Sequence, residues 1–283
     1  MPKMAAAPSS KRKPKLGQHF LDSASHAIGI VEALGDISAS TVLEIGPGGG
    51  ALTSLLARRA RRLIAVELDR VLAAQLRLQF GMTRNTEILE ADILSVDFDS
   101  LLGPRPGTSS PGLERSSDRV KVVGNLPFYI TSEILLRLFA HHRHFSVLVL
   151  MVQREVADRI VAGPGGSDYG LLSATVRLYG RAEKVMDVPR AAFRPPPKVD
   201  SAVLRITLDP KLEALGVESE AFIAFLRQSF GQKRKTLWNN LKSSYDPPTL
   251  RRALLIAEVT PTSRAETLSL EQSAALFRAL KQP

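Results

Sequence analysis

The sequence predicts a doubly wound α/β fold, with a parallel sheet covered by helices on both faces, followed by a small α-helical domain. Three observations lead to this prediction. Short apolar runs typical of buried strands alternate with helical segments up to residue 208, and from about Pro210 only helical periodicity remains. The chain has 283 residues and is 44% hydrophobic, which is ample for a proper core.

A glycine-rich turn lies at the centre of the prediction. Val42 to Ile45 is a run of buried-strand type that leads into Gly46-Pro47-Gly48-Gly49-Gly50, and the apolar-periodic segment Leu52 to Leu56 follows at once. This pattern predicts a strand, a glycine loop and a helix. Such a loop lets the backbone approach a ligand and offers N–H groups at a helix start. Dinucleotides and S-adenosylmethionine both use loops of this kind, and a tight turn without a ligand is a third reading.

The other elements follow in order. Residues 1–15 predict a mobile basic arm, and a helix is expected from Ser23 to Leu34. The predicted strands are Thr41–Ile45, Arg62–Glu67, Thr86–Asp92, Val120–Gly124, Ser146–Val152, Glu183–Val188 and Ala202–Leu208. Helices are expected up to about Arg59, over Val71–Phe80, from Thr131, over Val156–Ile160 and Leu171–Tyr179, and finally over Glu220–Phe230, Thr236–Leu241, Thr249–Leu255 and Leu270–Leu280.

The predicted boundaries divide the chain into three parts. The basic arm covers residues 1–15, the α/β domain covers 16–208, and the helical domain covers 209–283. Residues 103–117 are rich in Gly, Pro, Ser and Thr and predict a flexible surface insertion within the α/β domain.

The charge balance indicates a polyanionic partner. The net charge is +10 with a pI near 10.1. Two acid-free basic clusters, far apart in sequence, predict a long electropositive track, although excess charge that only aids solubility remains an alternative. One cluster contains Lys3, Lys11, Arg12, Lys13 and Lys15, and the other runs from Arg227 to Lys242 and includes Lys233, Arg234 and Lys235.

Cysteine, histidine and hydropathy patterns exclude several classes. No apolar run is long enough for a bilayer and the N-terminus lacks a secretory signal, so we expect a cytoplasmic protein with no membrane partner. The chain has no cysteine, which rules out disulfides and thiolate metal sites. His141, His142 and His144 cluster at a predicted helix end without carboxylates at ligand spacing, so we predict no metal.

Acidic residues end two further predicted strands. Glu67 lies 21 positions after Gly46, where a carboxylate can accept hydrogen bonds from both hydroxyls of a ribose. Asp92 ends the third strand, where it could accept a hydrogen bond from the amino group of an adenine, with Ile93 packing on the ring. Each acid alone could be a helix cap. Because Gly46, Glu67 and Asp92 all lie at the carboxyl ends of consecutive predicted parallel strands, together they predict an adenosine site.

The stretch Asn125-Leu126-Pro127-Phe128 carries the chemistry. The exocyclic amine of adenine is a poor nucleophile because its lone pair is delocalised into the ring. An amide oxygen of Asn125 and the Leu126 carbonyl, held by Pro127, can accept its two N–H hydrogens and direct the lone pair toward an electrophile, while Phe128 offers a face for the unstacked base. A strand-terminating turn is the alternative. No strong general base is needed, because the methylated ammonium is acidic enough to lose a proton to water.

Five motifs in this order resemble the ribosomal RNA adenine dimethyltransferase family. They are Gly17-Gln18-His19-Phe20-Leu21, Glu44-Ile45-Gly46-Pro47-Gly48-Gly49-Gly50, Gly124-Asn125-Leu126-Pro127-Phe128, Phe193-Arg194-Pro195-Pro196-Pro197-Lys198-Val199-Asp200-Ser201 and Arg234-Lys235-Thr236-Leu237. The resemblance is strongest to the bacterial small-subunit branch. It implies a Rossmann-like class I methyltransferase sheet and an S-adenosylmethionine-dependent enzyme.

The resemblance also implies a substrate and a set of site residues. The expected reaction is dimethylation of N6 of two adjacent adenosines in a hairpin loop near the 3′ end of 16S rRNA, in the 30S particle during small-subunit biogenesis, by a monomeric enzyme. Lys11, Arg12, Lys13, Lys15, Lys233, Arg234 and Lys235 would grip rRNA phosphates. The family's cofactor positions match His19, Leu21, Gly46, Glu67, Asp92 and Asn125, and Phe193 matches an aromatic that flanks the target base from the side opposite Phe128.

Two residues depart from the family pattern. The family often has Asn in place of His19 and Tyr in place of Phe128. Three other functions stay open at this point: a macrolide-resistance type large-subunit rRNA methyltransferase, a nucleotide-dependent oxidoreductase, and a non-catalytic RNA-binding factor on a methyltransferase core.

Overall fold

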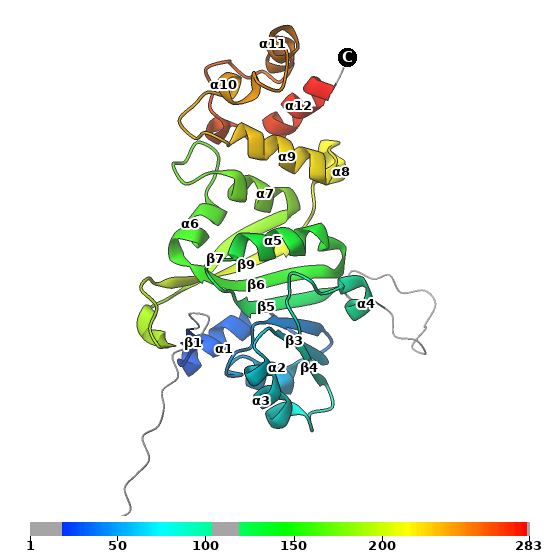
Figure 1. The fold of residues 1–283 in the computed structure, drawn as a ribbon, viewed down its shortest axis with the longest axis vertical. Coiled ribbons are helices and arrows are strands. Elements are labelled where there is room, and N and C mark those ends of the chain that lie inside the picture. Colours follow the sequence, from blue (N-terminus) through cyan, green and yellow to red (C-terminus); the bar gives the residue numbers. More distant parts are fainter. Residues whose placement is uncertain (1–18, 104–118, 282–283) are drawn as a thin grey trace, which may run out of the picture.

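The computed structural model describes residues 19–103 and 119–281. Its main feature is a seven-stranded sheet of order β4-β3-β2-β5-β6-β9-β7 (Figure 1). The strands are β2 (Thr41–Ile45), β3 (Arg62–Glu67), β4 (Thr86–Glu90), β5 (Val120–Asn125), β6 (Phe145–Gln153), β7 (Gly180–Val188) and β9 (Ser201–Leu208). The predicted basic arm, and residues 104–117 of the predicted insertion, lie outside the described residues.

The sheet departs from the fully parallel prediction at one strand. Strands β4, β3, β2, β5 and β6 pair in parallel, whereas β9 pairs antiparallel with both β6 and β7. Parallel neighbours need a crossover connection, usually a helix, and the proline-rich segment 189–200 between β7 and β9 holds no α-helix. The chain therefore turns back into the adjacent strand.

Helices cover both faces of the sheet, as predicted. They are α1 (Ala24–Glu32), α2 (Thr53–Arg59), α3 (Arg70–Phe80), α4 (Phe98–Leu102), α5 (Thr131–Ala140), α6 (Arg154–Val161) and α7 (Leu171–Tyr179). Strand β2 shows the two faces directly. Leu43 and Ile45 join a buried cluster with residues of α5 and α7, while Val42 joins a second cluster with residues of α1 and α2. Alternate side chains of a strand point to opposite faces, so both faces are buried.

A helical region follows the sheet and packs on α7. It contains α8 (Leu212–Leu215), α9 (Ser219–Ser229), α10 (Leu237–Leu241), α11 (Pro247–Ile256) and α12 (Leu270–Lys281). The Tyr179 hydroxyl at the end of α7 lies 2.5 Å from Ser219 Oγ, and Phe222 and Phe225 belong to the same buried cluster as Tyr179. In Figure 1 this region occupies the end of the molecule opposite α2 and α3. The domain boundary at residue 209 stays a prediction.

A two-stranded ribbon joins the N-terminal segment to the proline-rich connection. Strand β1 (Phe20–Leu21) pairs antiparallel with β8 (Phe193–Arg194), so that Leu21 lies opposite Phe193. The Asp22 N–H donates to the Ala192 carbonyl at 2.8 Å, and the Asp22 carboxylate also forms an ion pair with Arg194. The ribbon brings two sequence motifs together that are about 170 residues apart.

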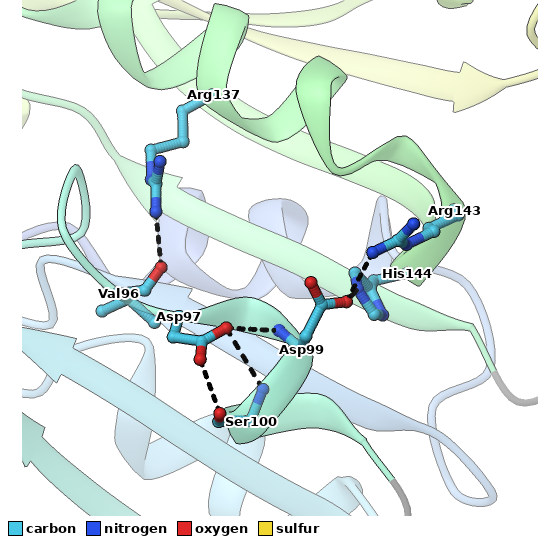
Figure 2. Close-up of polar contacts among 7 residues, drawn as sticks. All are labelled: Val96, Asp97, Asp99, Ser100, Arg137, Arg143 and His144. Atoms are coloured by element: carbon cyan, nitrogen blue, oxygen red, sulfur yellow. Dashed lines mark hydrogen bonds and ion pairs between the residues drawn. The ribbon is translucent and has the colours of Figure 1, made fainter.

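Helix α4 is joined by a polar cluster to the short 3-10 turn His142–His144 that follows α5 (Figure 2). Asp99 accepts hydrogen bonds from Arg143 and His144, each at 2.7 Å. These donors, Arg143 first, hold the pKa of Asp99 below its usual value. The interpretation that the histidine cluster has no carboxylate at ligand spacing is therefore wrong, because Asp99, His141 and His144 place ligand atoms within 4.8 Å of one another.

Across residues 19–103 and 119–281, no helix is both long enough and apolar enough to cross a membrane.

Candidate active site

A cavity of about 670 Å³ opens at the carboxyl ends of β2, β3 and β5. These strands pair in parallel, with Ile45 opposite both Val66 and Gly124, so the segments that follow them meet at one edge of the sheet. The cavity size falls in the range of small-molecule sites. All the predicted cofactor residues line it, namely His19, Leu21, Gly46, Glu67, Asp92 and Asn125. So do the predicted catalytic residues Asn125, Leu126, Pro127, Phe128 and Phe193.

The glycine loop forms one wall, and its N–H groups are already engaged. Gly46 N–H donates to the Val66 carbonyl at 2.9 Å, Gly48 N–H to Glu67 Oε2 at 3.0 Å, and Gly50 N–H to the Pro47 carbonyl at 2.9 Å. Gly48 has φ +56°, and a Cβ there would lie 3.0 Å from the Phe20 ring. The loop thus fits closely under β1, and these three N–H groups do not face a pyrophosphate.

The two predicted adenosine-binding acids hold different positions. Glu67 ends β3 and is only 3% exposed, and its carboxylate also accepts the Asp69 N–H at 2.9 Å. Asp92 is exposed and accepts the Leu94 N–H at 2.9 Å. The predicted third strand is too long by two residues, because β4 ends at Glu90. Asp92 therefore lies in the turn after the strand, still on the cavity wall.

A third acid, Glu44, lies in the cavity wall and was not predicted to have a role. It is 1% exposed, and neither carboxyl oxygen has a hydrogen-bond partner among the described residues. Burial raises the pKa of Glu44 to about 8; nearby Thr53 opposes this shift and Glu67 adds to it. An acid inside a run of buried-strand residues was the available signal in the sequence. An orphaned buried carboxyl on a cavity wall is suited to a cationic ligand group.

The Asn125 amide is oriented by a backbone contact from the residue that precedes β1. Its Nδ2 donates to the His19 carbonyl at 3.1 Å, and within residues 19–103 and 119–281 nothing donates to its Oδ1. The His19 imidazole does not bind Asn125, since its Nδ1 donates to the Pro195 carbonyl at 2.7 Å. His19 therefore reaches Asn125 through its backbone, while its imidazole joins the N-terminal segment to the proline-rich connection and lies beside the Phe128 ring.

Two aromatic residues complete the predicted target-base site. Phe128 is partly buried and lies 6.4 Å from the His19 ring at an interplanar angle of 26°. Phe193 is 2% exposed and lines the same cavity from β8. Leu68 and Tyr129 also line the cavity and were not singled out in the sequence, although each directly follows a predicted site residue.

The predicted RNA-binding residues that the structure describes do not line the cavity. Lys233, Arg234 and Lys235 are exposed on the segment between α9 and α10, and Lys233 Nζ donates to the Ser167 carbonyl. That segment lies on the same side of the molecule as β1 in Figure 1. Lys11, Arg12, Lys13 and Lys15 lie outside the described residues.

Fold and site together define the class of protein. Two buried acids, Glu44 and Glu67, line a cavity beside a glycine loop whose N–H groups are largely occupied. The unpartnered Glu44 carboxyl suits a cationic group such as those of S-adenosylmethionine, and Glu67 can accept from ribose hydroxyls. The occupied N–H groups of the loop and the nearby acids disfavour the pyrophosphate of a dinucleotide. The protein is a Rossmann-like methyltransferase that uses S-adenosylmethionine.

Comparisons with known proteins identify the family. Residues 9–282 match the family described as ribosomal RNA adenine dimethylase. The chain is 54% identical to ribosomal RNA small subunit methyltransferase A of Koribacter versatilis over 100% of both chains. It is 52% identical to the protein of that name from Acidobacterium capsulatum, over 98% of this chain and 94% of the relative. The chain belongs to the ribosomal RNA adenine dimethylase family.

Solved structures agree with this assignment. A dimethyladenosine transferase from Plasmodium falciparum aligns with a TM-score of 0.71 at 25% identity, over 91% of this chain and 96% of that one. The 23S rRNA methyltransferase ErmE aligns with a TM-score of 0.66 at 28% identity, over 93% of this chain and 100% of that one. The predicted fold class is confirmed, and family membership decides against the oxidoreductase reading.

The Glu44 carboxyl leads to a prediction for cofactor binding. Near neutral pH this carboxyl carries its proton, because its pKa lies at about 8. Cationic groups entering the cavity favour the ionised form and lower that pKa. We therefore expect S-adenosylmethionine to release a proton when it binds at pH 7. Calorimetry in two buffers of different ionisation enthalpy should give different apparent binding enthalpies, and Glu44→Gln should remove the difference. Equal enthalpies for the parent protein would contradict the prediction.

Proposed function

We propose that this protein dimethylates N6 of two adjacent adenosines in a hairpin loop near the 3′ end of 16S rRNA. It acts as a monomer on the assembling 30S particle and uses S-adenosylmethionine as methyl donor. The observation that carries the proposal is the arrangement of Asn125, whose amide N–H is taken by the His19 carbonyl so that Oδ1 is left to accept from a substrate. The 54% identity to a small-subunit methyltransferase over the full chain supports the choice of rRNA.

The residues of the chain perform most of the work by positioning. Asn125 Oδ1 and the Leu126 carbonyl accept the two N6 hydrogens of the target adenine, which localises the nitrogen lone pair away from the ring. Pro127 restrains the turn, and its carbonyl accepts from Ile130 N–H and Thr131 Oγ1, both at 3.2 Å. Phe128 and Phe193 hold the flipped base by its faces. Orientation of this kind is worth roughly 7–11 kcal/mol of the barrier.

The donor supplies a methyl group bonded to a positively charged sulfur. The N6 lone pair forms the new bond to the methyl carbon, the carbon–sulfur bond breaks, and its electron pair stays on sulfur. The resulting ammonium loses its proton to water, so the chain needs no strong base. In the second round on the same nitrogen a single hydrogen remains, so one of the two acceptors holds the amine, and loss of that last proton after transfer gives the dimethylated base. Two more rounds on the neighbouring adenosine complete the product.

Methyl transfer to undermethylated 30S particles tests the proposal. With labelled S-adenosylmethionine, nucleoside analysis of 16S rRNA should yield N6,N6-dimethyladenosine. Undermethylated 50S particles serve as the matched substrate control, because the 23S rRNA methyltransferase ErmE is a structural relative. Product found only in large-subunit RNA would overturn the assignment and favour the macrolide-resistance type of reaction.

Binding to the particle is expected to weaken with salt. Three exposed cations on the segment between α9 and α10, Lys233, Arg234 and Lys235, are proposed to contact rRNA phosphates. Replacing all three by Ala should weaken 30S binding and reduce the slope of log K against log salt by about 2 to 3, since each phosphate contact contributes about 0.7–0.9. Filter binding at several salt concentrations measures the slope.

A matched variant separates this effect from general loss of charge. Arg58, Arg59 and Arg61 are also exposed, but they lie near the start of β3, at the edge of the sheet away from the cavity. Replacing them by Ala removes the same charge and should leave the slope nearly unchanged. An equal loss of slope in both triple variants would mean that only net charge matters.

A further inference from the structure

Tyr129 is the one exposed aromatic residue among those that line the cavity within the described chain. Its side chain is 63% exposed, whereas Phe20 and Phe128 are partly buried and Phe193 is 2% exposed. Tyr129 directly follows Phe128 in the turn between β5 and α5. It therefore lies on the outer part of the wall that Phe128 continues inward.

The Tyr129 side chain makes no hydrogen bond and no ring contact with the described residues. Among residues 19–103 and 119–281, its hydroxyl has no hydrogen-bond partner and its ring has no aromatic partner. The tyrosines of α7 and the 163–170 loop behave differently: Tyr179 and Tyr169 are each 1% exposed, and both stack or pack against other rings. Burying an aromatic ring stabilises a fold, so its exposure at Tyr129 leaves that surface free for another molecule.

The backbone beneath Tyr129 is nevertheless fixed. The Pro127 carbonyl accepts hydrogen bonds from Ile130 N–H and the Thr131 hydroxyl, one residue and two residues beyond Tyr129. Thr131 is the first residue of α5 and is buried. The turn is thus anchored on both sides, and the ring projects from a rigid support rather than from a free loop.

A nucleic acid substrate presents a partner for such a ring. When one base leaves its stack and enters the cavity, the nucleotide joined to it cannot follow and must remain at the mouth, unstacked on one side. Aromatic side chains stack on bases of any sequence, because every base has a π-face. At the mouth of this cavity, Tyr129 supplies an exposed aromatic face on which the nucleotide adjacent to the flipped base can stack.

We propose that Tyr129 stacks on the nucleotide adjacent to the adenosine being methylated and so holds the RNA in register at the cavity mouth. The inference rests on the proposed function and extends it to a second base. Because two adjacent adenosines are modified in turn, the adenosine outside the cavity occupies the Tyr129 position while its neighbour reacts. Tyr129 is thus a substrate-binding residue that does not contact the methyl donor.

Steady-state kinetics on undermethylated 30S particles test this role. Tyr129→Ala should raise KM for the particle by about 5- to 150-fold, the range that stacking of one base on an aromatic side chain represents, and should change kcat much less. Tyr129→Phe keeps the ring and should restore the parent KM. The affinity for S-adenosylmethionine and the melting temperature should match the parent in both variants. Leu78→Ala, at an 88% exposed position on α3, is the matched control for loss of exposed apolar surface.

Photo-crosslinking identifies the contact itself. Tyr129→p-benzoylphenylalanine, irradiated on undermethylated 30S particles, should crosslink to a nucleotide next to a target adenosine in the hairpin loop, and the same substitution at Leu78 should not. If the parent enzyme methylates 30S particles but Tyr129→Ala has the parent KM, this inference is wrong and the proposed function stands. Loss of cofactor affinity in Tyr129→Ala would also overturn it by placing the ring at the donor. A parent enzyme that transfers no methyl group to 30S particles overturns the proposed function as well.

Discussion

Asn125→Ala is expected to lower the rate of methyl transfer at saturating cofactor by about 100- to 1,000-fold, the range measured when one transition-state hydrogen-bonding group is removed. The physical reason is the loss of Oδ1 as acceptor for the target amine. The lone pair of that amine then stays delocalised in the adenine ring. The measurement is single-turnover methylation of undermethylated 30S particles, with particle binding followed in parallel and expected to change little.

A second asparagine provides the control for structural damage. Asn85 Nδ2 donates to the carbonyls of Ala57 at 3.0 Å and Ala60 at 2.7 Å, far from the cavity. Asn85→Ala should lower the melting temperature without changing the methylation rate. If Asn125→Ala kept most of the methylation rate, the Asn125 amide would have only a structural role at the end of β5. The proposed activation of the target amine would then be wrong.

Much of this site could be predicted because it follows from local sequence. Strand, glycine loop and helix are adjacent in the chain, and Glu67 and Asn125 each end a short apolar run. Parallel strands bring such ends to one edge, so the fold rule alone places these residues together. The structure confirms that they share a cavity, while their roles toward cofactor and substrate stay predictions.

The rest depended on contacts that are distant in sequence. The ribbon β1–β8 pairs two strands of two residues each, which are too short to leave a periodic signal. Yet this pairing brings the His19 backbone to Asn125, and that contact does not depend on which side chain stands at position 19. Asp99 likewise reaches Arg143 and His144 across more than 40 residues, so the histidine cluster could not be interpreted correctly from spacing.

Burial was the other missing quantity. Glu44 lies in the conspicuous motif with Gly46, but its lack of hydrogen-bond partners depends on how β2 packs against the start of α2. Tyr129 is likewise next to a predicted residue, and only its 63% exposure distinguishes it from a core aromatic. For both residues, the position in or beside a motif predicts that the side chain lies near the site. Its solvent exposure, which the sequence does not show, determines what the side chain can bind there.

Glu67→Gln is expected to weaken S-adenosylmethionine binding by about 10- to 150-fold, because a hydrogen bond to a charged acceptor contributes about 1.5–3 kcal/mol. Each Glu67 oxygen already accepts one backbone N–H, from Gly48 at 3.0 Å and from Asp69 at 2.9 Å, and each retains a lone pair for a ribose hydroxyl. Glutamine keeps one acceptor oxygen and replaces the other with a donor. One of the two N–H groups must then lose its partner, so the melting temperature should also fall. Isothermal calorimetry and thermal melting measure the two effects.

Glu90→Gln separates ligand binding from strand-end structure. Glu90 lies directly opposite Glu67 in the β3–β4 pairing, but its side chain is exposed and pairs with Arg77 at 3.2 Å. This variant should change neither affinity nor melting temperature by much, because an exposed ion pair contributes little. A Glu67→Gln protein that melts lower yet binds S-adenosylmethionine like the parent would show that Glu67 only supports the glycine loop. In that case Asp92, Glu44 and Asp22 would be the remaining acids on the cavity wall, and Asp22 is already paired with Arg194.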